Sequence, residues 1–167
     1  MLKKNPKEFF VIAHNIRSLY NVGSIFRTAD AFGATKIFLT GYTGTPLTPK
    51  HAAKIAKVAL GAETWIPWEK SPTAFALIRS LRKKYPKITV VGLDNNIAGG
   101  RPQPLAKFRP KFPLALILGE ERQGISKPLV KLCDKIVEIP MLGKKESLNV
   151  SVAFGIAAYQ IRSGAVA

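Results

Sequence analysis

Three segments of the chain carry polar side chains whose types and spacing suit contact with a substrate. Asn21 and Arg27, six residues apart, suit a phosphate or a ribose, because amide and guanidinium groups donate hydrogen bonds to oxygen. Glu120 follows a glycine and suits the edge of a crevice. Ser147 and Asn149 belong to a strand, loop and helix junction, IPMLGKKESLN, which sets a hydroxyl and an amide beside backbone N–H groups.

Each of these side chains also has a purely structural interpretation. Asn21 is equally suited to cap the first helix, and Arg27 to pair with Asp30 three residues on. Glu120 is equally suited to stabilise the N-terminus of a following helix. The serine and asparagine of the junction are equally suited to cap the last helix. Spacing alone leaves both interpretations open.

The common nucleotide and metal motifs are absent from the sequence. The first apolar run leads into HNIRSLYNVGS rather than GxGxxG, and no P-loop, HExxH or paired CxxC occurs. The two histidines, His14 and His51, are isolated, so we predict no metal site. His14 suits a satisfied ring at the end of a strand better than a catalytic base. The lone Cys133 suits an inert, buried helix face better than a nucleophile.

Positive charge is the strongest signal in the composition. The 167 residues include 26 Lys and Arg against 10 Asp and Glu, a net charge of +16. A field of this sign attracts RNA or DNA, and a solvated surface is the simpler alternative. Candidate RNA contacts are Lys3, Lys4, Lys7, Arg79, Arg82, Lys83, Lys84, Lys144 and Lys145. Trp65 and Trp68 could stack on bases, but their WIPW segment better suits packing in an edge strand.

Apolar runs of strand length alternate with helical patterns along the chain. This order predicts an α/β fold, a mostly parallel sheet with helices on both faces. The expected strands are residues 9–13, 36–39, 88–93, 114–118 and 136–139, with an edge strand at 64–68. The expected helices are residues 22–32, 50–59, 72–84, 127–133 and 148–162.

Helix-end residues and glycine-rich loops mark the boundaries of these elements. Ser71 before Pro72 predicts a helix start, and Gly33 predicts a left-handed residue after the first helix. Ser126 is expected to cap the fourth helix, with Pro128 in its first turn. Loops rich in Gly or Pro follow strands at residues 40–46, 93–102, 119–124 and 140–147. Ligands bind beyond the carboxyl ends of parallel strands, so we expect the chemistry there.

Length and hydropathy predict one domain, residues 1–167, in the cytoplasm. A chain of about 150 residues buries roughly 68–70% of its unfolded surface, which allows a sizeable core. The apolar runs, such as Leu114–Leu118, are far shorter than the roughly 20 residues that span a bilayer. The start, MLKKNPKEFF, lacks the long apolar region and cleavage site of a signal peptide. We therefore expect no membrane association.

The three polar segments together resemble the motifs of the SpoU (TrmH) family of RNA ribose 2'-O-methyltransferases, within the SPOUT superfamily. The first is NVGSIFRTADAFGA at residues 21–34, the second LILGEERQGIS at 116–126, and the third IPMLGKKESLNVSVA at 139–153. Their order and spacing match those of the family. The resemblance covers nearly the whole chain.

The resemblance implies a deep trefoil knot at the C-terminal end, whose residues form a pocket for S-adenosylmethionine. Backbone contacts are expected from Gly119, Ile139 and Leu148, and pocket-lining side chains from Leu118, Met141 and Ser147. Glycine permits close backbone approach, and apolar side chains can enclose an adenine and a thioether.

The resemblance also implies a homodimer that shares its RNA site across the interface. The last helix has a small apolar face, Val152, Gly155, Ile156 and Tyr159, that suits a partner, with packing in the protein's own core as the alternative. Some family members recognise tRNA or rRNA with N- or C-terminal arms. This chain has no substantial extension at either end, so we expect recognition to rest on its basic face.

Arg27 matches the family arginine placed at the target ribose. Because arginine is nearly always protonated, we expect it to organise the target phosphate and stabilise the developing alkoxide. By the same resemblance, Asn21 holds the RNA or Arg27, Glu120 orients neighbouring groups, and Ser147 with Asn149 completes the catalytic wall. The alternatives are a knotted enzyme that methylates a base nitrogen, and a basic RNA-binding module without activity.

Overall fold

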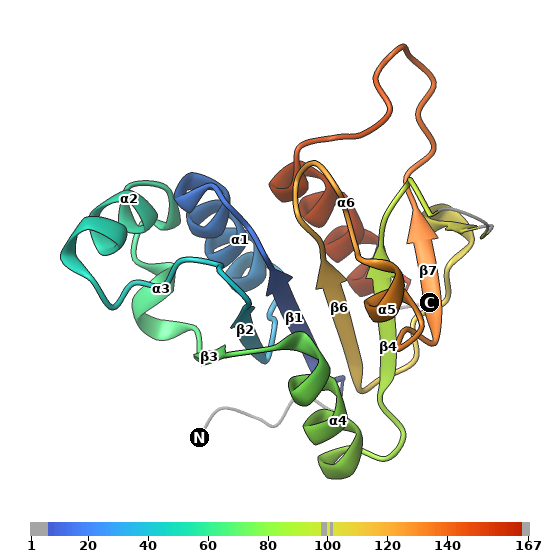
Figure 1. Ribbon diagram of the computed structural model, residues 1–167, viewed down its shortest axis with the longest axis horizontal. Coiled ribbons are helices and arrows are strands. Elements are labelled where there is room, and N and C mark those ends of the chain that lie inside the picture. Colours follow the sequence, from blue (N-terminus) through green and yellow to red (C-terminus); the bar gives the residue numbers. More distant parts are fainter. Residues whose placement is uncertain (1–6, 98–99, 101, 165–167) are drawn as a thin grey trace.

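A parallel β-sheet forms the centre of the computed structural model, which describes residues 7–97, 100 and 102–164 (Figure 1). The strands within these ranges are β1 (Phe9–His14), β2 (Lys36–Thr40), β3 (Trp68–Ser71), β4 (Thr89–Leu93), β5 (Gln103–Pro104), β6 (Leu114–Leu118) and β7 (Lys135–Glu138). Their order across the sheet is β3-β2-β1-β6-β4-β7-β5, and every pairing between these strands is parallel. The carboxyl ends of the strands therefore share one edge.

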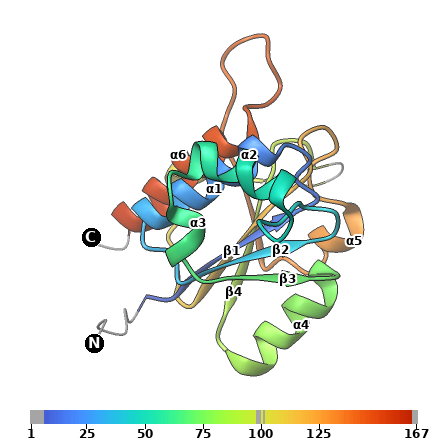
Figure 2. The ribbon, with the colours of Figure 1, turned by 90° about the vertical axis from the view of Figure 1, so that its left-hand side faces the viewer.

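Helices cover both faces of the sheet, as the sequence predicts. One face carries α1 (Leu19–Ala31), α2 (Pro49–Ala59), α3 (Ala62–Trp65) and α6 (Val150–Ser163), and the other carries α4 (Ala74–Lys84) and α5 (Lys127–Val130). A short 3-10 helix, η1 (Leu105–Lys107), follows β5. Figure 2 shows α1, α2 and α6 on one side of the strands and α4 on the other. The predicted α/β fold class is confirmed.

The central strands are apolar at nearly every position because both faces are buried. In β1, Phe9, Val11 and Ala13 belong to the core beneath α1 and α6, whereas Phe10 and Ile12 belong to the core beneath α4. The alternation follows from the two-residue period of a strand. A strand covered on both sides reads as a continuous apolar run, which is how it was recognisable in the sequence.

Two glycines set the packing of α1. A Cβ on Gly23 would lie 2.4 Å from the carbonyl oxygen of Ile55, so only glycine lets α1 and α2 approach this closely. Gly33 has a φ of +60° just after α1, which confirms the predicted left-handed residue. The first of these glycines fixes α1 against α2, and the second returns the chain to the sheet.

The predicted edge strand at residues 64–68 is wrong in position. Residues Ala62–Trp65 form the short helix α3, and the edge strand β3 begins only at Trp68. Local hydrogen bonds favour the helical turn, because Glu63 accepts from the N–H of Gly61 and the Thr64 hydroxyl donates to the Gly61 carbonyl. Trp68 does pack in an edge strand, with its ring edge-on to Phe26 at a centroid distance of 6.4 Å.

The predicted start of α4 and the predicted end of α5 also differ from the structure. Helix α4 is capped by Thr73 rather than Ser71, because the Thr73 hydroxyl accepts from the N–H of Ala76 and Ser71 is the last residue of β3. Ser126 is the N-cap residue of α5, but its side chain makes no capping hydrogen bond. That helix ends at Val130 rather than Cys133, since the N–H groups of Leu132 and Cys133 bond to carbonyls three residues back, in tight turns.

The last helix begins later than the sequence indicates. Helix α6 starts at Val150 rather than Leu148, and Asn149 is its N-cap, accepting a hydrogen bond from the N–H of Ser151 at 2.9 Å. The short strand β5, paired with β7, was not predicted. No helix within the described ranges is long and apolar enough to cross a bilayer.

Candidate active site

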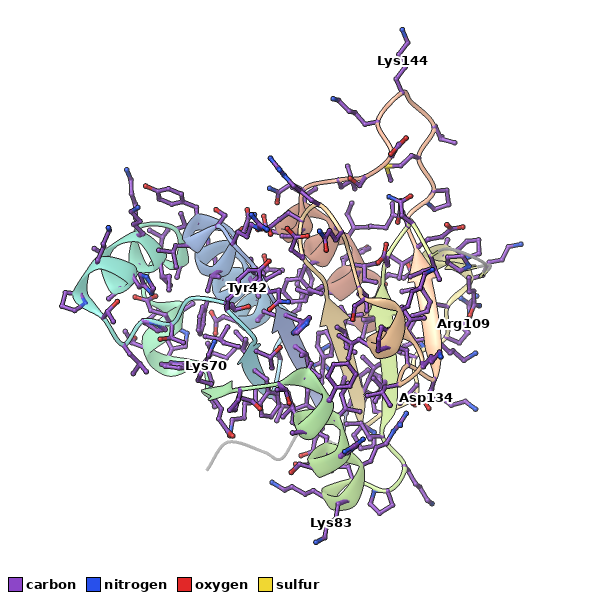
Figure 3. The ribbon with its side chains drawn as sticks, in the orientation of Figure 1. Tyr42, Lys70, Lys83, Arg109, Asp134 and Lys144 are labelled. Atoms are coloured by element: carbon purple, nitrogen blue, oxygen red, sulfur yellow. The ribbon has the colours of Figure 1, made fainter. Side chains whose placement is uncertain are left out.

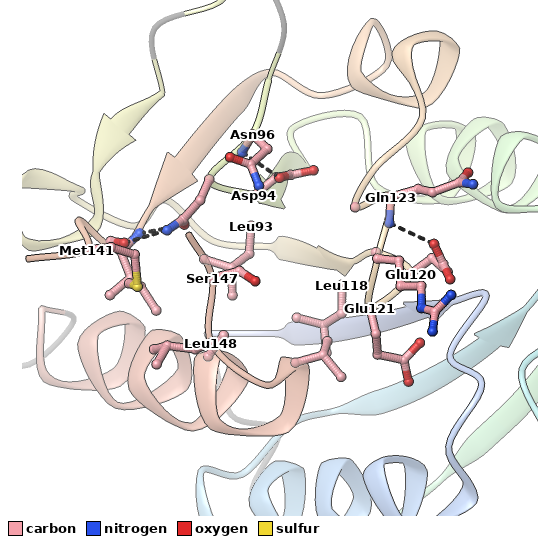
Figure 4. A pocket seen from close by; sticks show the side chains of 17 residues that line it. Leu93, Asp94, Asn96, Leu118, Glu120, Glu121, Gln123, Met141, Ser147 and Leu148 are labelled. Atoms are coloured by element: carbon pink, nitrogen blue, oxygen red, sulfur yellow. Dashed lines mark hydrogen bonds between the residues drawn. The ribbon is translucent and has the colours of Figure 1, made fainter. Parts of the chain in front are cut away.

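A pocket lies at the carboxyl edge of the sheet, beyond three neighbouring strands, β6, β4 and β7, and against the start of α6 (Figure 4). Its walls include all six residues that the resemblance predicts at a cofactor: Leu118, Gly119, Ile139, Met141, Ser147 and Leu148. The six come from two segments that are about twenty residues apart in sequence. The fold brings them to one place, as the resemblance implies and as the shared carboxyl edge of the parallel strands allows.

The loop after β6 is folded tightly by a close backbone approach. A Cβ on Gly119 would lie 2.5 Å from the carbonyl carbon of Gly124, so a side chain there would push the loop open. Glu120 and Gly124 exchange backbone hydrogen bonds of 3.2 and 2.8 Å. Gly124 itself has a φ of +65°, which favours glycine. The loop therefore presents backbone groups to the pocket in a fixed arrangement.

The loop after β4 bonds to the segment that follows β6 and to the segment that follows β7. Asp94 accepts from the N–H of Ile125 at 2.7 Å. Asn95 forms two bonds to Ile139, donating to its carbonyl at 2.6 Å and accepting from its N–H at 3.1 Å. Sequence reasoning pointed to this loop but to none of its residues. Its Asp-Asn-Asn sequence after a strand was the available signal, because such side chains bond readily to backbone.

Glu120 is a buried carboxylate on the pocket wall with one oxygen incompletely satisfied. Its side chain is 8% exposed, and its Oε2 accepts from the N–H of Gln123 at 2.7 Å. Its Oε1 lies 2.9 Å from Nε of Arg17, the distance of an ion pair. The Nε–H group of Arg17 is poorly directed toward Oε1, so Oε1 has no hydrogen-bond partner among the described residues. A ligand donor would therefore find an acceptor here.

Asn21 and Asn149 meet, although 128 residues separate them. The amide of Asn149 donates to Oδ1 of Asn21 at 3.1 Å, and the Asn21 amide donates to Glu121 at 3.2 Å. Asn21 lies inside α1 rather than capping it, because Ser18 is the cap. The first and third polar segments are thus joined beside the pocket, and Asn149 combines its capping role with this contact.

Glu121 is the member of this network that sequence reasoning missed. Its carboxylate also accepts from the N–H groups of Arg17 and Ser18, at 3.2 and 3.3 Å. Burial raises its pKa, but hydrogen bonds from its own backbone, from Arg17 and Ser18, and from the Asn21 amide outweigh that effect and hold the pKa below its ordinary value. The available signal for Glu121 was its place next to Glu120 in the sequence. The two carboxylates have different partners in the structure, Gln123 for Glu120 and Asn21 for Glu121.

Arg27 lies apart from the pocket walls. Its side chain is exposed on α1, and none of the described residues forms a hydrogen bond or ion pair with it. The alternative pairing with Asp30 is not found, because Asp30 accepts from the indole N–H of Trp65 at 2.9 Å. Ser147 lines the pocket and is exposed.

The candidate RNA contacts are divided between two ends of the molecule. Figure 3 shows Lys144 at the tip of the loop after β7 and Lys83 at the opposite end, on α4. Arg82 is already engaged, donating to Asp134 and to the Leu132 carbonyl at 2.9 Å each. Lys145 is exposed beside Lys144, and Arg79 and Lys84 are exposed on α4.

The remaining candidates lie at the N-terminus. Lys3 and Lys4 fall outside the described residues. Lys7 is half-buried, and its carbonyl accepts from Arg162 at 3.0 Å. The backbone of Lys7 is thus tied to the C-terminal helix.

Neither His14 nor Cys133 adds a reactive group to the site. Nδ1 of His14 is 2.9 Å from the Thr40 hydroxyl, a satisfied ring at the end of β1, and burial lowers its pKa. Burial, with the neighbouring Asp134 charge, raises the pKa of the Cys133 thiol to about 12, far from a reactive thiolate. Within the described residues, no three His, Cys, Asp or Glu side chains gather as metal ligands do.

Comparison with protein families places these features in a known group. The family described as the SpoU rRNA Methylase family matches residues 8–159 of the chain. Among individual proteins, the chain is 33% identical to the putative TrmH family tRNA/rRNA methyltransferase YacO of Bacillus subtilis (strain 168), over 95% of this chain and 60% of that protein. It is 30% identical to the tRNA (guanosine(18)-2'-O)-methyltransferase of Aquifex aeolicus (strain VF5), over 96% and 71%.

Solved structures give the same result for the fold. The SpoU methyltransferase AviRb from Streptomyces viridochromogenes, in complex with the cofactor AdoMet, aligns with a TM-score of 0.83 and 26% identity. The alignment covers 99% of this chain and 63% of that one. The chain spans about 60% of the length of several curated relatives that it matches.

Proposed function

The chain belongs to the SpoU rRNA Methylase family, and we propose that it transfers a methyl group from S-adenosylmethionine to a ribose 2'-hydroxyl of tRNA or rRNA. The observation that carries the proposal is one pocket, lined by the six cofactor-motif residues, beside the joined side chains of Asn21, Asn149 and Glu121. The names of the relatives from Bacillus subtilis and Aquifex aeolicus support tRNA or rRNA as the substrate.

The pocket fits the chemistry of this cofactor. S-adenosylmethionine supplies a methyl group on a positively charged sulfonium. Three of the chain's 10 acidic residues, Asp94, Glu120 and Glu121, line this pocket of a protein with net charge +16, against one basic residue, Arg122, so a cationic ligand is favoured there. Leu118 and Met141 add apolar walls. The cofactor-bound structure of AviRb supports the same assignment.

We propose that Arg27 acts on the RNA side of the reaction. A ribose hydroxyl holds its proton too tightly to attack readily at neutral pH, so the site must align it and assist proton loss. The Arg27 guanidinium stays protonated, so it binds the target phosphate and stabilises the developing alkoxide, while that phosphate or water takes the proton. Asn21 and Asn149 orient the sugar, and Ser147 completes the wall beside them.

We infer that the active form is a homodimer in which a second copy completes the RNA site. On α6, Val152, Ile156 and Tyr159 are exposed at a spacing that puts them on one face, and Gly155 between them leaves room for close approach. Placing a charge there, as in Ile156→Asp, should give a monomer by light scattering and lower methyl transfer. A wild-type protein whose molar mass corresponds to one chain would contradict the dimer.

Family membership also supports the two remaining inferences. We propose that the C-terminal segment forms the trefoil knot implied by the SpoU resemblance, which brings the loop after β7 across the pocket. We also propose that the protein acts in the cytoplasm, where tRNA and rRNA are modified.

Methyl transfer to RNA tests the proposed activity. Incubation with labelled S-adenosylmethionine and total RNA should place label in the RNA fraction. Arg27→Ala should lower the rate at least about 1,000-fold, because the charge that stabilises the transition state is lost, while cofactor affinity measured by calorimetry stays within about twofold. Retained turnover in Arg27→Ala would remove this residue from the mechanism. No saturable cofactor binding, with or without RNA, would identify an inactive RNA-binding module.

A further inference from the structure

An exposed aromatic ring stands on a rigid loop next to the pocket. Tyr42, in the loop after β2, is 53% exposed. Its backbone N–H donates to the Asn15 side chain at 3.1 Å. The ammonium of Lys70 donates to the carbonyls of Gly41 and Thr43, the residues before and after Tyr42, at 2.5 and 2.8 Å. An exposed ring on a fixed backbone is preorganised to receive a flat partner.

The adjoining residues require this loop shape. Gly41 has a φ of +62°, and a Cβ there would fall 1.8 Å from Oδ1 of Asn15. The Thr43 hydroxyl donates to the carbonyl of Ala13 and accepts from the N–H of Ile16, both at 2.9 Å. The loop thus holds Tyr42 outward for a structural reason, and the ring itself takes no part in that network.

Arg17 connects the ring to the pocket wall. Its guanidinium carbon lies 5.8 Å from the centre of the Tyr42 ring, and its Nε lies 2.9 Å from the buried carboxylate of Glu120. Tyr42 and then Glu120 hold the pKa of Arg17 above its ordinary value, so its charge is permanent. Arg17 is itself 62% exposed. One side chain therefore spans from the pocket wall to an exposed aromatic face.

This pairing matches the chemistry of single-stranded RNA recognition. Unstacked bases are commonly bound by stacking on aromatic side chains or on arginine planes, and each stacked base contributes about 1–3 kcal/mol. The exposed tryptophan Trp65 has its indole N–H bonded to Asp30, and it lies on α3 rather than in a loop at the pocket. Tyr42 with Arg17 is the aromatic and cationic pair beside Glu120.

We propose that Tyr42 and Arg17 form a platform on which a nucleobase next to the methylated ribose stacks. The proposal rests on RNA as the substrate, and it names the part of the surface that takes a base rather than a phosphate. Glu120 orients Arg17 from the pocket side, so the platform and the pocket keep a fixed relation. The target nucleotide can then enter the pocket while its neighbour is held outside.

Binding of a fluorescein-labelled single-stranded RNA of mixed sequence, about twelve nucleotides long, tests the platform without any need for methyl transfer. Tyr42→Ala should weaken binding about 5- to 100-fold, whereas Tyr42→Phe, which keeps the ring, should stay within about threefold. A stacking contact releases no counterions, so the slope of log Kd against log salt should not change for Tyr42→Ala. Trp65→Ala is the matched control and should bind as the wild type does.

Two outcomes would overturn the platform. One is equal affinity of Tyr42→Ala and the wild-type protein. The other is an equal loss in Tyr42→Ala and Trp65→Ala, which would indicate general damage rather than stacking. Failure of the proposed activity is separate: label would be absent from RNA with the wild-type protein, whatever the Tyr42 variants bind. If transfer is observed, Tyr42→Ala should raise the KM for RNA and leave the Kd of S-adenosylmethionine unchanged.

Discussion

Two arginine–carboxylate ion pairs with the same N···O distance lie at opposite edges of the sheet. Arg17 meets Glu120 after β6, at the carboxyl edge, and Arg82 meets Asp134 before β7, at the amino edge, both at 2.9 Å. Glu120 is buried, and its Oε1 has no well-directed donor among the described residues. Both Asp134 oxygens are used, one by Arg82 and one by the N–H of Val90 at 2.7 Å.

The difference shows how the same pair of side chains can serve two purposes. At the amino edge, Asp134 and Arg82 fasten α4 and the start of β7, and no acceptor is left over. At the carboxyl edge, an incompletely satisfied carboxylate faces a pocket, a condition that costs stability unless a ligand repays it. We expect changes at the first pair to alter stability and changes at the second to alter function.

The largest effect should follow from forcing the Glu120 loop out of position. Gly119→Val places a branched side chain where even a Cβ would be 2.5 Å from Gly124, so the loop must open. Affinity for S-adenosylmethionine, measured by calorimetry, should fall more than about 100-fold, or about 2.7 kcal/mol. Gly143→Ala is the control, because a Cβ there has no atom within 4 Å, and it should bind normally. Equal affinities of Gly119→Val and the wild-type protein for S-adenosylmethionine would show that this loop takes no part in cofactor binding.

Neutralising the carboxylate of each pair should have different effects on the reaction rate and on stability. Glu120→Gln should slow methyl transfer about 10- to 100-fold and change the free energy of unfolding by less than about 1 kcal/mol, because its Oε1 has no hydrogen bond to lose and its ion-pair partner Arg17 is 62% exposed to water. Asp134→Asn should lower the free energy of unfolding by about 1–2 kcal/mol, since an amide NH2 must face Arg82 or the Val90 N–H.

Urea unfolding and single-turnover transfer measure both quantities on both variants. Glu69→Gln, which weakens the exposed Lys36–Glu69 pair, is the control and should alter stability by less than about 0.5 kcal/mol. A slower reaction in Asp134→Asn, at full folding, would remove the distinction between the two pairs.

The smallest effect should appear in the pH dependence of stability. Because the pKa of Glu121 is held below its ordinary value of 4.5, its contribution is complete above that value and is lost as the pH falls through the lower folded-state value. Glu121→Gln should remove on the order of 1 kcal/mol of stability at about pH 7, and the stabilities of the two proteins should converge once the pH falls below the folded-state pKa of Glu121. If the free energies of unfolding of the two proteins, measured with urea, differ by the same amount at every pH in this range, the stabilisation does not come from the Glu121 charge.

The comparison also shows what the sequence could predict. Continuous apolar runs such as β1 and β6 predict buried parallel strands, and the motif resemblance predicts that Gly119, Ile139 and Leu148 share a pocket, as they do. The Arg17–Glu120 contact joins residues 103 apart, and no local pattern reports such a pairing. Residues 64–68 read as an edge strand, yet hydrogen bonds to Gly61 fold Ala62–Trp65 into a helix. Propensity is weak wherever such local bonds compete.

The position of the transferred methyl group tests the central claim most directly. RNA labelled by the wild-type protein should be digested to nucleosides and analysed by mass spectrometry, with fragmentation to separate base from sugar. The account predicts a methyl group on the ribose at its 2' oxygen. Label on a base nitrogen, or no label in any nucleoside under conditions where S-adenosylmethionine binds, would contradict it.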